Sequence, residues 1–291
     1  MPLKLFIRLI RKIPASIYRI FRILYRVTKY FNHCNGPIVA NSLTFTFALA
    51  FIPFVVSLTV LVYLMPLSRQ LIDGIEHFYL NIFIPQSGEE IYHLFRISFA
   101  HSSNLSMLGL CSLVISCYAL MFALERHINI MFMRRRNRPF WYSVISFSGI
   151  ISINLLFVYY LGYVVVHLYR VFPSVEDSHF VSLSLAHFDT FVAFLLIYKF
   201  IPYRNIQLKN AIICACLATI CFAIVQGGFM LSISWLKNEY ITLYGSLAVL
   251  PIFLLWIYSE ALILLFFSAL LFIFEDKPHW HSRFKRYKKK S

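Results

Sequence analysis

Two carboxylates stand near the centres of long apolar stretches of this sequence. Asp189 lies within residues 181–201, and Glu260 lies within residues 244–274. A charged side chain in the middle of a bilayer is costly, so such residues are functional candidates by default. A neutral carboxyl group that exchanges its proton would serve a proton-coupled carrier. A protonated acid that only packs against a neighbouring helix explains the same residues equally well.

Amides occupy comparable positions in two further apolar stretches. Asn154 and Gln226 lie in mid-stretch, where an amide either lines a polar path or bridges two helices. Together with Asp189 and Glu260, they form the candidate transport path.

Small residues near one of these amides predict close helix packing. Gly227 and Gly228 are adjacent, and Ala211, Ala215 and Ala218 recur at helical steps. Small side chains let the backbones of two membrane helices approach closely.

The start of the last apolar stretch carries a candidate hinge, Gly245 and Pro251. Glycine adopts backbone conformations that other residues avoid, and an interior proline removes a helical hydrogen bond. A helix over residues 244–274 is longer than the hydrocarbon core is thick, so it could span with tilt or with a bend at Pro251. The alternative is an interfacial aromatic residue, Tyr244, followed by an ordinary flexible position.

A second polar set lies where the second apolar stretch ends. Glu125 and Asn129 are four residues apart and share one face of a helix. Glu125 is expected to pair with an arginine of residues 134–138 or with Lys199. A cytoplasmic gate is the functional interpretation of Glu125, Asn129 and Lys199. A structural ion pair near the membrane surface is the more common arrangement.

Six long apolar stretches must position these residues. The chain of 291 residues is 60% hydrophobic and only 13% charged, and its mean hydropathy is +0.72. A helix of roughly 20 apolar residues crosses the ~30 Å hydrocarbon core. The predicted fold is therefore all-α: a polytopic membrane protein with six transmembrane helices and an N-terminal amphipathic interfacial helix. The spans are expected at about 40–64, 105–124, 141–168, 181–201, 209–236 and 244–274.

The net charge of +15 is distributed to suit this topology. The segments 1–35, 125–140, 199–209 and 275–291 hold 23 of the 27 Lys and Arg residues. Loops rich in Lys and Arg stay on the cytoplasmic side of a membrane. Both termini are therefore predicted to be cytoplasmic. The charge indicates orientation and contact with anionic headgroups, and no nucleic-acid partner.

Three segments flank or interrupt the predicted six-span membrane domain, residues 36–275. Residues 1–35 form a cytoplasmic basic arm, in which Arg and Lys recur at helical steps beside an apolar face, as in helices that lie on a membrane surface. Residues 65–104 form an external loop, and residues 276–291 form a basic cytoplasmic tail.

Cysteine usage and motif content argue against an enzyme. Five of the six cysteines fall within the predicted spans and the sixth, Cys34, falls on the cytoplasmic side, so we expect no structural disulfide and no metal site. The sequence contains no nucleophile elbow, phosphate-binding loop or His-Glu-x-x-His motif. We expect no enzymatic activity and no cofactor.

Several linked motifs resemble the YihY/BrkB family of bacterial inner-membrane proteins (UPF0761-like), some of which were once misannotated as ribonuclease BN. The motifs are Ala-Asn-Ser-Leu-Thr-Phe at 40–45 with Phe-Ile-Pro at 51–53, Leu-Glu and Ile-Asn within 124–129, Tyr-Lys-Phe-Ile-Pro at 198–202, and Tyr-Gly-Ser-Leu-Ala at 244–248 with Leu-Trp-Ile-Tyr at 255–258. The family has Gly-Ala late in its last span, where this chain reads Phe267-Ser268-Ala269. The resemblance implies six spans and a multi-pass bacterial inner-membrane location.

The function predicted from these features is that of a transporter or lipid-handling carrier with an anionic or lipidic substrate. A basic cytoplasmic collar suits such a substrate. The alternative is a non-transporting membrane scaffold that recruits envelope partners, and ribonuclease activity is not expected. The expected partners are membrane lipids at the cytoplasmic collar, and a homo-oligomer is compatible with the sequence.

Overall fold

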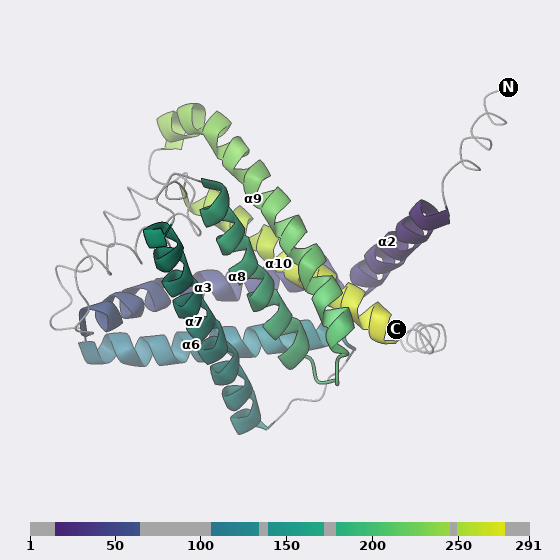
Figure 1. Cartoon of the computed structure of the whole chain (residues 1–291), viewed down its shortest axis with the longest axis horizontal. Helices are drawn as coiled ribbons and strands as arrows, with labels where there is room; N and C mark the ends of the chain where they lie inside the picture. The colour runs from purple at the N-terminus through teal and green to yellow at the C-terminus, as the bar shows by residue number, and fades with distance from the viewer. Residues whose placement is uncertain (1–14, 65–105, 134–138, 172–178, 245–248, 277–291) are drawn as a thin grey trace.

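The computed structural model describes residues 15–64, 106–133, 139–171, 179–244 and 249–276, and within these ranges all regular secondary structure is helical (Figure 1). The helices are α2 (Ala15–His33), α3 (Gly36–Leu64), α6 (Ser106–Met131), α7 (Phe140–Val171), α8 (His179–Phe200), α9 (Leu208–Tyr244) and α10 (Val249–Glu275). The all-helical prediction is confirmed for this part of the chain.

Three of these helices are long and apolar enough to cross a bilayer. The qualifying segments are Phe140–Leu161, Leu208–Ser232 and Pro251–Glu275, and a shorter apolar segment covers Gly36–Ala50. These segments come from the described residues alone, so the total of six spans stays a prediction. Residues 1–14, 65–105, 134–138, 172–178, 245–248 and 277–291 lie outside the described residues, and these include the predicted external loop and the hinge candidate Gly245.

Helix α10 lies at the centre of the bundle and packs against α2, α3, α6, α8 and α9 (Figure 1). Its buried face combines small and branched residues: Leu265, Ser268 and Ala269 are fully buried. Around it, α7 packs on α8, α8 on α9, and α3 on α6.

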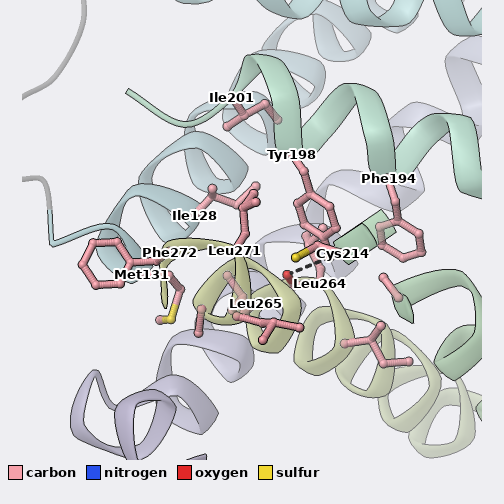
Figure 2. Close-up of a cluster of buried hydrophobic side chains, with 14 of the residues drawn as sticks. Ile128, Met131, Phe194, Tyr198, Ile201, Cys214, Leu264, Leu265, Leu271 and Phe272 are labelled. Atoms are coloured by element: carbon pink, nitrogen blue, oxygen red, sulfur yellow. Dashed lines mark hydrogen bonds between the residues drawn. The ribbon is translucent and has the colours of Figure 1, made fainter. Parts of the chain in front are cut away.

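A cluster of buried side chains joins four of these helices near one end of the bundle. Figure 2 shows Met131 of α6, Tyr198 of α8 and Cys214 of α9 gathered around Leu264 and Leu271 of α10. The Tyr198 hydroxyl donates a hydrogen bond to the Leu264 carbonyl at 3.2 Å. A buried phenol normally requires such a partner, and this bond fixes the register between α8 and α10.

The small residues of α9 behave in two different ways. Ala211, Ala215 and Ala218 are fully buried, as expected where helices approach closely. Gly227 and Gly228 are exposed, and a Cβ added to either would meet no atom within 4 Å. No element that the structure describes reaches that face of α9, so among the described residues the close approach is seen at the alanines and not at these glycines.

The start of the last predicted stretch borders residues outside the described ranges. Helix α9 continues to Tyr244, and α10 begins only at Val249. Pro251 is the third described residue of α10. Because residues 245–248 lie outside the described residues, the bend expected at Pro251 stays a prediction.

Candidate functional site

A buried polar cluster, which we call the polar junction, joins α6, α7 and the α8–α9 turn. It comprises Glu125, Asn129, Ser143 and the backbone N–H of Tyr203. The Ser143 hydroxyl donates to Oε1 of Glu125 at 2.9 Å. The Asn129 amide donates to the Glu125 carbonyl at 2.7 Å, and its oxygen accepts the Tyr203 N–H at 2.9 Å. Glu125 and Asn129 are only 8% and 2% exposed.

The junction explains why α6 carries these residue types four positions apart. An Asn side chain has both a donor and an acceptor, so Asn129 turns back to its own helix and also holds the turn that follows α8. Buried polar groups without partners are costly, and both groups of this amide are paired. The junction therefore fixes three separate chain segments to one another.

Lys199 does not join this cluster in the structure. Its ammonium group donates to the Ile206 carbonyl within the α8–α9 turn, whereas the Glu125 carboxylate accepts from Ser143. Among the described residues, no ion pair joins Glu125 to Lys199. The arginines of 134–138, the other predicted partners of Glu125, lie outside the described residues.

A second set, which we call the clasp, ties the start of α9 to the end of α10. Arg204 forms an ion pair with Asp276, Nη1 to Oδ1, at 3.2 Å, and its Nη2 donates to the Glu275 carbonyl at 3.2 Å. The Glu275 carboxylate accepts the backbone N–H of Gln207 at 2.9 Å and the Asn210 amide at 2.8 Å. A carboxylate at a helix N-terminus is stabilised by unpaired N–H groups and the helix dipole.

The clasp was missed in the sequence analysis. Its signal was present, because Glu275 and Asp276 are adjacent acids in a segment otherwise rich in Lys and Arg. Acids in such a surrounding are expected to have local partners. Only the fold shows that the partners come from a turn about 70 residues earlier.

The end of α2 is also part of this assembly. The Tyr30 hydroxyl donates to the Met131 carbonyl at 2.6 Å, and its ring stacks on Phe272 with centroids 5.0 Å apart. Val27, Tyr30 and Phe31 are buried, whereas Phe21 is 69% exposed. The sequence predicts that this segment belongs to a surface arm, but its last two turns pack in the core.

Two of the four path candidates contact each other. The Asn154 amide of α7 donates to Oδ1 of Asp189 on α8 at 3.4 Å, a long hydrogen bond. Glu260 on α10 has a buried Oε1 without a hydrogen-bond partner. Gln226 on α9 is partly exposed. Within the described part of the chain, no hydrogen bond joins Gln226 or Glu260 to the Asn154–Asp189 pair.

The two acids lie at different depths along the bundle. Helices α8 and α10 both end near the polar junction and the clasp, and the Tyr198–Leu264 bond sets their register. This bond places Tyr198 of α8 level with Leu264 of α10. Four residues earlier on each helix, Phe194 is therefore level with Glu260. Asp189 is five residues further from that end, about 8 Å along the helix axis. Asp189 and Glu260 therefore differ in depth by more than one helical turn.

The described residues contain no group of three or more His, Cys, Asp or Glu side chains placed to hold a metal ion. Cys34, in the turn between α2 and α3, is a free thiol. Burial raises its pKa to about 11, although a hydrogen bond with Tyr30 opposes this shift. The described geometry thus consists of a structural polar network at one end of the bundle and an isolated Asn–Asp pair further along.

Comparison with known proteins places this arrangement among membrane proteins. The family model described as "Virulence factor BrkB" matches residues 27–290. A UPF0761 membrane protein of Alteromonas mediterranea is 24% identical over 237 residues, covering 80% of each chain. One from Pseudoalteromonas atlantica is 23% identical over 266 residues, covering 88% of each chain. A longer one from Nitrosospira multiformis is 26% identical over 264 residues, covering 89% of this chain and 62% of its own length. No solved structure matches the chain.

Proposed function

This chain belongs to the virulence factor BrkB family of membrane proteins, and we propose that it is a six-span inner-membrane carrier for a lipid or another anionic substrate. Its polar path is formed by Asn154, Asp189, Gln226 and Glu260. The carrier moves its substrate without chemical conversion, so the proposal requires a path and a means of changing its access.

The observation that carries this proposal is the Asn154–Asp189 contact between α7 and α8. Asp189 stands eleven residues before the end of α8, about 16 Å along the helix, which is roughly half the thickness of the hydrocarbon core. An acid at that depth is expected to face the protein interior or a water-filled cavity and to have a partner. Asn154 is a neutral partner, which orients the carboxyl group and leaves it able to exchange a proton.

Glu260, on α10, which packs against α8, also supports the proposal. Its Oε1 is buried without a hydrogen-bond partner, and unpaired buried polar groups cost free energy. A helix kept for packing alone would be expected to carry an apolar residue at that position. We propose that Glu260 binds a proton or a substrate group in a state other than the one described here.

The helix ends that meet at the polar junction and the clasp, and the basic segments beside them, support a cytoplasmic position for both. The ends of α2 and α6, the α8–α9 turn and the end of α10 come together there. The sequence segments around these points hold most of the Lys and Arg residues. By the positive-inside rule, that side faces the cytoplasm, which gives an even number of spans and both termini inside.

Reconstitution into vesicles tests the proposal. Full-length protein would be compared with Asp189→Asn and with Ser148→Ala, a control on α7 whose side chain is exposed. Translocation of acyl-chain-labelled phospholipids and of radiolabelled organic anions would be measured. We expect protein-dependent translocation that falls at least tenfold in Asp189→Asn and is unchanged in Ser148→Ala.

Wild-type rates equal to those of protein-free vesicles for every substrate tested would reject the carrier. Such a result would favour the scaffold alternative. Equal translocation by wild type and Asp189→Asn would keep the carrier and remove the acid from its path.

A further inference from the structure

A small cavity beside the polar junction has no role in the carrier path described above. It lies between α6, α7 and α8, and Glu125, Ser143 and Ser146 supply its polar lining. The apolar lining comes from Met121, Phe147, Ile150, Phe200 and Ile201. Its volume is about 10 Å³, which is close to the minimum that holds one water molecule. A ligand group that enters it must therefore be about the size of water.

The cavity lies at the level of the membrane interface. Ser143 is the fourth residue of α7, directly after Trp141 and Tyr142, which are 73% and 57% exposed. Exposed Trp and Tyr residues at the end of a membrane helix mark the headgroup level. Glu125 stands six residues before the end of α6, about 9 Å along the helix. Lipid headgroups, and not acyl chains, are the neighbours expected at this depth.

The polar lining of the cavity offers hydrogen-bond acceptors around one acid, and its two serine hydroxyls can also donate. An ionised carboxylate accepts about four hydrogen bonds, and the Glu125 side chain receives one, from Ser143. The hydroxyl oxygens of Ser143 and Ser146 can accept further bonds. The described residues place no cationic side chain in an ion pair with Glu125. The cavity therefore suits a small positively charged donor.

We propose that this cavity binds the primary ammonium group of an aminophospholipid headgroup, with Glu125 as the counter-ion and Ser146 as an acceptor. An ammonium group is about as large as water and has three donors. Two phenylalanines in the lining, Phe147 and Phe200, suit a cation that needs little further hydration, because aromatic rings attract cations. A sodium ion would need several more oxygen ligands than this mostly apolar lining provides.

This inference deepens the lipid branch of the proposed function, since it names a headgroup class and a binding site at the cytoplasmic interface. It is separable from transport. Lipid binding at Glu125 can be measured without measuring translocation. The cavity contacts α8 at Phe200, at the end of the helix, whereas Asp189 lies eleven residues earlier.

Lipid binding by the detergent-solubilised full-length protein tests the site. Native mass spectrometry would count bound phosphatidylethanolamine, phosphatidylcholine and phosphatidylglycerol, with soluble ethanolamine and sodium as competitors. We compare wild type, Glu125→Gln, Ser146→Ala and the exposed control Ser148→Ala. A charge-assisted hydrogen bond to a buried carboxylate corresponds to about a tenfold change or more in affinity. Thermal stability of each variant in the same detergent identifies any folding defect.

The proposal predicts that phosphatidylethanolamine binds at least tenfold more tightly than phosphatidylcholine, whose trimethylated nitrogen is too large for the cavity. Glu125→Gln and Ser146→Ala should each weaken this binding, and Asp189→Asn should leave it intact. Equal binding of the two lipids, or unchanged binding in Glu125→Gln, would overturn the proposal.

Displacement by sodium at equal potency would assign the cavity to a metal cation, and displacement by soluble ethanolamine alone would assign it to a soluble amine. Because Ser146 has no part in the polar junction, its variant keeps the test valid if Glu125→Gln fails to fold.

Discussion

The ion pair of the clasp allows a quantitative prediction about how the bundle is closed. Arg204→Gln removes the guanidinium group that pairs with Asp276 at 3.2 Å and donates to the Glu275 carbonyl at 3.2 Å. The Asp276 side chain is 3% exposed, and that of Arg204 is 30% exposed. The substitution therefore removes a guanidinium group from a buried carboxylate.

The expected cost lies between two known limits. An exposed ion pair contributes about 0–1 kcal/mol, whereas removing one partner of a buried pair costs about 3–5 kcal/mol. Since one partner is buried and the other is partly solvated, we expect Arg204→Gln to reduce the free energy of unfolding by about 2 kcal/mol. Asp276→Asn, which removes the buried charge itself, should cost less.

A double-mutant cycle in mixed micelles measures this interaction. Unfolding by SDS would be followed by far-UV circular dichroism for wild type, Arg204→Gln, Asp276→Asn and the double variant. We expect a coupling energy of about 1 kcal/mol or more. Lys209→Gln is a matched control, because this exposed lysine in the first turn of α9 carries the same charge. If Arg204→Gln were as stable as Lys209→Gln, or the coupling were zero, the clasp would not stabilise the fold.

The same packing predicts the behaviour of four further positions. Glu275→Gln should lower stability by about 1 kcal/mol in the same SDS titration, because it removes a carboxylate from the N-terminus of α9; an unchanged midpoint would contradict this. Gly36→Ala should destabilise by about 1–3 kcal/mol, because its Cβ would clash with the buried Phe31 ring. By contrast, Gly228→Ala should stabilise by about 0.5–1 kcal/mol, because the position is helical and open; equal effects of the two changes would refute this reasoning. Cys34, with its pKa near 11, should react with maleimide at pH 7.5 about a hundredfold more slowly than in the SDS-unfolded chain. The raised pKa also predicts that the Cys34 thiol contributes to stability below pH 9 and loses this contribution as the pH rises to about 11. SDS titrations at pH 8 and pH 11, on a variant that retains only this cysteine, would detect the loss.

The helical class and the apolar segments could be predicted because both depend on local composition. Hydropathy and length are properties of one segment, and they identify a helix that suits a bilayer. The shared face of Glu125 and Asn129 was also predictable, since helical periodicity alone brings residues four apart together.

The packing faces could not be predicted in the same way. A lipid-facing leucine and a core leucine have equally apolar surroundings, so hydropathy does not separate them. On α10, Leu255 is 58% exposed in the bundle, whereas Leu265 is fully buried. The position of Tyr30 against Phe272 was missed for a related reason: its partner lies more than 240 residues away, beyond any local pattern.

The partner of each polar residue was equally hidden. Lys199 was expected to pair with Glu125 on charge alone, but the turn after α8 offers a nearer acceptor, the Ile206 carbonyl. Charge predicts which residues need partners. The tertiary fold decides which partners they obtain.

Water access to Asn154 tests the proposed polar path most directly. In a cysteine-free protein reconstituted in vesicles, Asn154→Cys would be exposed to a membrane-impermeant thiol reagent from each side. Leu156→Cys is the matched control, two residues away on the same helix, at a position where the leucine is 68% exposed on the bundle surface and would face lipid. We predict labelling of Asn154→Cys from at least one side and no labelling of Leu156→Cys. If Asn154→Cys were as unreactive as Leu156→Cys from both sides, the carrier path through the Asn154–Asp189 pair would be contradicted.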